Sequence, residues 1–156
     1  MKKIVLSTKI LILSMLFVLP SCSSSSDDDA GNGGGGPIGT PQHQVLETLL
    51  INESWTVSYY YHNDQEETDS FNFYGFDFFQ SNRVESSDGF ETYIGTWSVT
   101  DGSNDDILVN LSFASPEVFS QLTKTWKIIN FDESFVELVE NSNSGGNPDK
   151  VTFRKI

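Results

Sequence analysis

The sequence is poor in the residue types that build cross-links and metal sites. Its 156 residues include one cysteine and two histidines. A single thiol cannot form a disulfide within the chain, so the fold must depend on its hydrophobic core. His43 and His62 have no second histidine or cysteine near them at ligand spacing, which argues against a zinc site. We therefore expect no metal and no cofactor.

Basic residues are also scarce, with 9 lysines and arginines against 22 aspartates and glutamates. Three of the basic residues and none of the acidic ones precede residue 22, so the rest of the chain has a formal charge of −16. Nucleic acids need cationic contacts to their phosphates, so a nucleic-acid partner is excluded. An anionic membrane surface would also repel this chain. Charge of this size favours a monomer.

No local signature of catalysis is present. Serines, aspartates and a histidine could form a triad on paper, but the sequence has no nucleophile elbow. Glycoside cleavage needs two carboxylates, and no motif in the sequence identifies such a pair. We expect a protein that is not an enzyme.

Two acidic turns offer oxygen ligands of the kind that calcium prefers. Neither turn has the glycine and distal glutamate of an EF-hand, and solvated surface turns explain both. Their residues are Asp64, Glu66, Glu67 and Asp69 in the first turn, and Asp101, Ser103, Asp105 and Asp106 in the second.

The first 21 residues have the pattern of a secretory signal peptide. A basic start with Lys2 and Lys3 precedes an apolar run over 10–19, and Ser21 is a small residue before the cut. The run is shorter than the roughly 20 residues of a membrane span. Cys22 follows, and this arrangement resembles the lipobox of bacterial lipoproteins, in which the cysteine is acylated and becomes the first residue. The alternatives are an ordinary signal peptide with an incidental thiol and a signal anchor.

This resemblance implies a bacterial outer-membrane lipoprotein that is attached through its N-terminal lipid. The serines after Cys22 and the acidic triplet 27–29 resemble the surface-export signal of Bacteroidetes lipoproteins. Periplasmic and outward orientations both stay open.

The remaining chain divides into a tether and one folded domain. Residues 22–39 are mostly serine, aspartate and glycine and contain little to bury, which is typical of a flexible linker. We expect one domain over 40–156, which is long enough to bury a core.

The domain is predicted to begin with a short helix. Thr40 suits its N-cap and Pro41 its first position, and apolar residues follow at helical spacing over 45–50. A helical turn is predicted near 116–122. Short strands with period-two alternation, separated by turn residues, are predicted at 55–61, 71–79, 82–87, 91–100, 107–113, 125–131, 135–140 and 150–156.

Eight such strands favour an all-β fold, an antiparallel up-and-down barrel that closes on itself and leaves no exposed sheet edge. A β-sandwich is the alternative, because the number of strands does not distinguish closure from two packed sheets.

Three tryptophan motifs carry a family resemblance over 44–156. They are Ser54-Trp55-Thr56-Val57, Gly95-Thr96-Trp97-Ser98-Val99 and Trp126-Lys127-Ile128-Ile129. With the leading helix, they resemble the lipocalin-like domains of Bacteroidetes lipoproteins. The resemblance implies a calycin-type barrel with an internal cavity. The Gly-x-Trp of true lipocalins lies on the first strand, whereas here it lies in mid-domain at 95–97.

Nineteen of the 20 aromatic residues lie in the folded domain, and six of them lie within 71–79. Most of these aromatic side chains are expected to fill the interior of the barrel, because each ring buries a large apolar area. The 71–79 segment has aromatic residues on both faces, so one row of rings, such as Tyr74, Phe76 and Phe78, must be covered or used. The leading helix could cover this row.

Two functions from different classes follow. The first is a barrel that binds a small apolar or aromatic ligand among inward-facing residues, for which the candidates are Trp55, Tyr59, Phe73, Trp97 and Trp126. The second is an accessory envelope protein with a packed barrel that binds a protein or a glycan through surface aromatics. A hydrolase is a third hypothesis, without a supporting motif.

Overall fold

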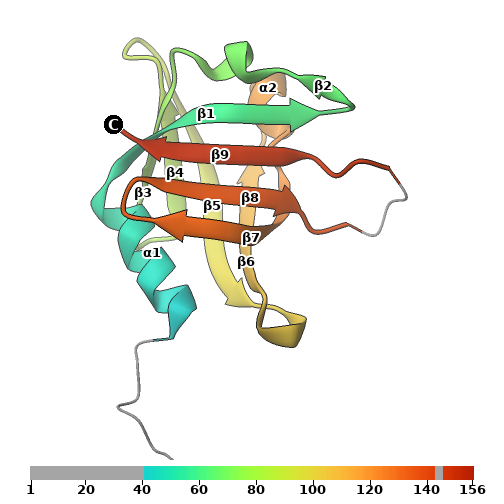
Figure 1. The fold of residues 1–156 in the computed structure, drawn as a ribbon. Helices are drawn as coiled ribbons and strands as arrows, with labels where there is room; N and C mark the ends of the chain where they lie inside the picture. Colours follow the sequence, from blue (N-terminus) through green and yellow to red (C-terminus); the bar gives the residue numbers. More distant parts are fainter. Residues whose placement is uncertain (1–40, 143–145) are drawn as a thin grey trace, which may run out of the picture. The chain divides into compact units, whose positions relative to one another are not determined.

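The computed structural model describes residues 41–142 and 146–156 (Figure 1). It has the expected all-β fold with a short N-terminal helix and a second short helix. The strands are β1 (Ser54–His62), β2 (Gln65–Glu66), β3 (Gly75–Phe78), β4 (Arg83–Ser87), β5 (Thr92–Asp101), β6 (Ile107–Phe113), β7 (Lys124–Asp132), β8 (Phe135–Glu140) and β9 (Lys150–Lys155).

Eight of these strands form a closed antiparallel barrel. Each of β3 to β9 pairs with its neighbour in the sequence, β1 pairs with β3, and β1 also pairs with β9 to close the sheet. The two-residue strand β2 pairs only with the end of β1 and extends it as a hairpin. The closure confirms the up-and-down barrel and is incompatible with the alternative of a sandwich.

Strict alternation of side chains fills the barrel. On β6, Ile107, Val109, Leu111 and Phe113 are buried, while the residues between them are not. A fully buried side chain of this kind contributes roughly 1.5–3 kcal/mol relative to an exposed one. The core is therefore continuous from one end of the barrel to the other.

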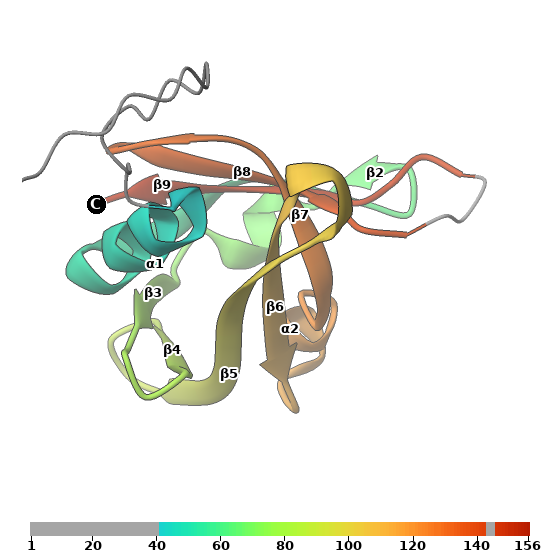
Figure 2. The same ribbon diagram turned by 90° about the horizontal axis from the view of Figure 1, so that it is seen from below.

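A helix lies at each end of the barrel (Figures 1 and 2). Helix α1 (Gln42–Asn52) buries Leu46 and Leu50 in the core at the end where β5 finishes. Pro41 takes the N-cap position, one residue later than predicted. At the other end, the 3-10 helix η1 (Thr68–Phe71) and helix α2 (Glu117–Ser120) insert Phe71 and Phe119.

The predicted strand over 71–79 is wrong in its first half. Phe71 ends η1, and β3 starts only at Gly75. Phe76 and Phe78 point into the core, and the exposed residue between them is Asp77. The aromatic rings of this segment belong to a 3-10 helix, a turn and a one-sided strand, so α1 has no outer row of rings to cover.

Candidate functional site

The three tryptophans are buried and their indole nitrogens are used within the fold. Trp55, Trp97 and Trp126 are at most 3% exposed. Their Nε1 atoms donate to the carbonyl oxygens of Leu50 (3.1 Å), Phe79 (3.0 Å) and Leu122 (2.9 Å), respectively. Each tryptophan thereby fixes a connecting segment: the end of α1, the β3–β4 turn and the chain after α2. These contacts are structural.

The other two predicted ligand residues do not point inward. A bulge between Val57 and Tyr59 on β1 turns Tyr59 to the outer face, where it is half-buried beside Thr152 on β9. Phe73 lies in the turn between η1 and β3 and is 82% exposed. The prediction that these side chains face the interior is wrong for both, because a bulge and a turn break the alternation on which it depended.

The barrel interior contains a buried aromatic cluster. The Phe119 ring centroid lies 5.4 Å from that of Phe113 and 5.7 Å from that of Phe76, and Phe76 contacts Phe153 at 5.4 Å. Most of these contacts are edge-on, as favoured by the ring quadrupole. This cluster occupies the space in which an internal ligand would lie.

Four cavities that the described residues line are found at the α1 end and on the outer face of the barrel. One of about 610 Å³ lies between the end of α1 and the β3–β4 turn, and one of about 310 Å³ lies beside Tyr59 on the outer face. Two more, of about 330 and 470 Å³, adjoin the start of α1. None of the four is lined by a tryptophan.

Four aromatic side chains lie at the end of the barrel that carries α2, two of them exposed and two, Tyr74 and Tyr93, half-buried against Phe119. Phe73 is 82% exposed, and Phe90, in the β4–β5 loop, is 96% exposed. The two loops leave the barrel side by side, since Gly75 pairs with Ser87 and the rings of Tyr74 and Tyr93 lie 6.3 Å apart. We call these four side chains, Phe73, Tyr74, Phe90 and Tyr93, the aromatic rim.

The polar groups next to the aromatic rim hold its loops in shape. Asp88 Oδ1 accepts hydrogen bonds from the backbone nitrogens of Phe90 and Glu91, each at 2.9 Å. The Tyr93 hydroxyl donates to Glu91, and this hydrogen bond raises the pKa of Tyr93 to about 12. The rim therefore presents mainly apolar ring surface on loops with a defined conformation.

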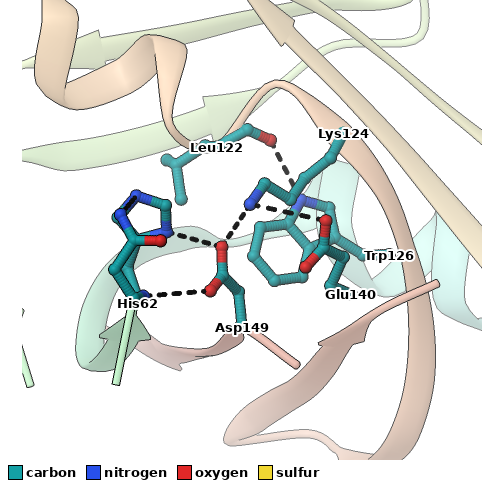
Figure 3. A network of polar contacts seen from close by, with 7 residues as sticks. His62, Leu122, Lys124, Trp126, Glu140 and Asp149 are labelled. Carbon is teal, nitrogen blue, oxygen red and sulfur yellow. Dashed lines mark hydrogen bonds and ion pairs between the residues drawn. The ribbon is translucent and has the colours of Figure 1, made fainter. Parts of the chain in front are cut away.

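A polar cluster lies where the end of β1 meets the start of β9 (Figure 3). The Asp149 carboxylate is 8% exposed and contacts Lys124 Nζ and His62 Nδ1, the latter at 2.6 Å. Asn63 Nδ2 donates to His62 Nε2 at 2.8 Å, which leaves Nδ1 as the donor to Asp149. Lys124 also reaches Glu140 Oε1 at 3.7 Å. The cluster thus joins β1, β7, β8 and the segment before β9.

Charge and burial compete at Asp149. Burial alone raises the pKa of its carboxyl group, but hydrogen bonds from Lys124 and His62, together with the charge of Lys124, hold the pKa below its usual value. Asp149 is therefore ionised in neutral solution and its charge is compensated by groups on other strands.

Next to this cluster lies a buried hydroxyl without a partner. Tyr60 is fully buried, its ring packs edge-on against Phe71 at 5.0 Å, and its Oη makes no hydrogen bond. Burial raises the pKa of Tyr60, and the charge of Asp149 raises it further. The Tyr60 side chain is therefore a neutral phenol in neutral solution.

Sequence reasoning did not find this cluster. His62 directly follows the strand predicted at 55–61, and Asp149 lies 87 residues later in a polar loop that gives no signal of burial. Only the closure of β1 against β9 brings the two together.

The carboxylates of the first acidic turn accept hydrogen bonds from side chains of the protein itself. Asn147 donates to Asp64 at 2.8 Å, Thr68 donates to Glu66 at 3.1 Å, and Asn72 donates to Asp69 at 2.8 Å. Within the described ranges, no group of three or more His, Cys, Asp or Glu side chains is placed to hold a metal ion.

Cys22, the signal segment 1–21 and the tether 22–39 lie outside the described residues. In the part of the chain that is described, no helix is both long and apolar enough to cross a membrane.

The fold and the site define a class, a small closed β-barrel with a buried aromatic cluster, and its architecture is compatible with a lipocalin-like fold. The chain matches no known protein family, no curated protein and no solved structure at a significant level.

Proposed function

We propose that this chain is an envelope lipoprotein, anchored to the outer membrane through a lipid on Cys22, whose packed barrel binds a partner protein through the aromatic rim. The observation that carries the proposal is the exposure of Phe73 and Phe90, at 82% and 96%, on adjacent loops. Exposed aromatic side chains that gather in one place are typical of binding surfaces.

The chemistry of the rim favours a protein over a glycan. Glycan recognition needs hydrogen bonds to hydroxyl groups, whereas Phe73 and Phe90 carry none of the necessary atoms and Asp88 is engaged with the loop backbone. A protein pocket that accepts two phenyl rings needs no such groups. The acidic residues beside the rings, Asp88 and Glu91, disfavour an anionic membrane surface.

A small apolar ligand within the barrel is the weaker hypothesis. The space it would need contains the buried aromatic cluster, and the three tryptophans that were expected to contact it donate their N–H groups to backbone carbonyls.

The test is photo-crosslinking in the native envelope, with a benzophenone amino acid placed at position 90. We expect a crosslinked complex that is lost in the variant Phe73→Ser, which should fold normally because that side chain is mostly exposed. The matched control places the same probe at Val45, which is 45% exposed on α1 at the other end of the barrel. A complex that forms equally well in the Phe73→Ser variant contradicts the role of the rim.

The lipid anchor has a test of its own. Cys22→Ala should release the protein from the membrane fraction, and persistent attachment contradicts the anchor.

A further inference from the structure

Among the strand edges of the described residues that lack a pairing strand, one lies on β7. On the side of β6, β7 pairs only from Lys124 to Lys127, opposite residues 108–111. On its other side, β7 pairs with β8 as far as Asp132. Within the described residues, no strand pairs with the β6-facing edge of β7 from Ile128 onward.

The corresponding gap on β1 is filled by the chain itself. β1 pairs with β3 only from Ser54 to Thr56. Farther along the same strand, Tyr60 N donates to Thr68 Oγ1 at 2.9 Å, Tyr60 O accepts from Glu67 N at 2.9 Å, and β2 pairs with the last residues. The edge of β7 differs in this respect from that of β1, which other segments of the chain cover.

A cavity of about 330 Å³ runs along the open edge. It is lined by residues 128–131 of β7, by Ile107 at the start of β6, by Asp105 and Asp106, and by Gln42 of α1. In Figure 1 this edge of β7 faces α1 and the loop before β6. Ile129 stands at a bulge and is 58% exposed. Unpaired backbone groups with exposed apolar side chains are the features by which a sheet edge accepts an added strand.

The charges of the residues that line the cavity indicate which kind of segment could bind there. The lining contains Asp105 and Asp106 but no lysine or arginine, and Lys127 Nζ on β7 lies 3.4 Å from Asp106 Oδ1. A second copy of this chain is disfavoured, because the chain after Ser21 carries a formal charge of −16. A segment with alternating apolar and basic side chains would match both the cavity and the carboxylates.

We infer that the edge of β7 from Ile128 to Asp132 binds an extended, cationic segment of a partner protein by strand addition. This surface lies at the end of the barrel away from the aromatic rim, and the inference does not depend on the function proposed for the rim.

The test uses the full chain and a short synthetic peptide that alternates lysine and valine, blocked at both ends. Binding should shift the backbone amide resonances of residues 128–132 and slow their hydrogen exchange. A peptide with glutamate in place of lysine should not bind, nor should the lysine peptide with its pairing backbone nitrogens methylated. The two peptide controls need no change in the protein.

Ile129→Lys should weaken peptide binding on the order of tenfold, because a lysine at an edge repels the peptide and blocks strand pairing. The matched control is Ile94→Lys, since Ile94 is 61% exposed on β5, and it should bind as the wild type does. Phe73→Ser should also leave peptide binding unchanged, which separates this site from the rim. Equal binding of the methylated peptide, or resonance shifts confined to other strands, would overturn the inference. A dimer that Ile129→Lys abolishes would assign the edge to a second copy and overturn it as well.

Discussion

Asp149 shows how one buried charge can connect distant parts of the chain. Its carboxylate contacts Lys124 on β7 and His62 on β1, and its backbone oxygen accepts from Glu140 N at 2.8 Å. Breaking one partner of a buried ion pair is costly because the other charge is left uncompensated. The cluster therefore stabilises the fold only while each of its buried charges keeps a partner.

Asp149→Asn should destabilise the fold by about 2 kcal/mol, less than the loss of an isolated buried pair because Lys124 keeps Glu140 as a partner. Urea unfolding followed by tryptophan fluorescence measures the change. Asp105→Asn is the matched control: this side chain is exposed, so its stability should be close to that of the wild type. An equal loss in both variants would contradict the role of the cluster.

Gly95 is required by close packing. A Cβ atom at this position would lie 2.5 Å from Ser112 O and 2.7 Å from the Phe113 ring. Both are held in place, the oxygen by the β5–β6 pairing and the ring by the core.

Gly95→Ala should cost about 2–3 kcal/mol, because extra volume in a packed core forces its neighbours to move. Gly146→Ala should be neutral, since nothing lies within 4 Å of a Cβ there. Thermal unfolding of the two variants compares them directly. A stable Gly95→Ala protein would mean that β5 and β6 can separate locally without loss.

At the scale of elements, α1 is held to the barrel by one apolar face. It has no side-chain cap at its start, its buried residues are Leu46 and Leu50, and Leu49 and Ile51 pack partly against the core. The Trp55 indole fixes its last turn through Leu50 O. Tertiary packing, rather than helix propensity, thus holds this helix in place.

Leu46→Ala should destabilise the protein by about 3 kcal/mol through the cavity it leaves. Val45→Ala, one residue earlier and 45% exposed, should change the free energy of unfolding by less than about 1 kcal/mol. Urea unfolding of both variants provides the measurement. A small effect of Leu46→Ala would show that α1 is dispensable for the core.

The sequence predicted the elements from β4 to β9 because their alternation is regular. Strand β8 has the predicted bounds, Phe135–Glu140, and β6 has the predicted inward row. It failed over 71–79, where aromatic residues fill the end of the barrel from a 3-10 helix and a turn. A segment with apolar residues at both odd and even positions can be a strand, or it can be a helix and turn that close the end of a barrel. Only tertiary packing distinguishes the two.

The candidate site was less predictable than the fold. Burial of the tryptophans follows from their type, but the bulge that turns Tyr59 outward has no local signal. The exposure of Phe73 and Phe90 depends on which loop positions the barrel leaves open. The Asp149 cluster depends on pairing between the first and last barrel strands, which alternation alone does not specify.

For the whole molecule, acid should lower stability. The pKa values of Asp88 and Asp132 lie below their usual range because backbone hydrogen bonds favour the ionised form, and that of Asp149 is lowered by its hydrogen bonds and ion pairs. A lowered folded-state pKa gives a contribution that is present above the unfolded value of about 3.9 and is lost as pH falls through the folded one.

Stability should therefore be nearly constant from neutral pH to about pH 5 and fall below about pH 4. The slope should be shallower in Asp149→Asn, which lacks one of the three groups. Urea unfolding at a series of pH values checks both statements. A wild-type protein whose stability rises on acidification through pH 4 would contradict this sign.

The pairing of β1 with β9 also sets the order of events during synthesis. Trp55 pairs with Lys155, and Ile156 N donates to Ser54 O at 3.0 Å, so the sheet cannot close until the last residues are available. Contacts between such distant residues form late and slow the folding of β proteins. The barrel therefore closes only after β9 has been synthesised, whereas the pairings from β3 to β8 need no residue beyond Glu140.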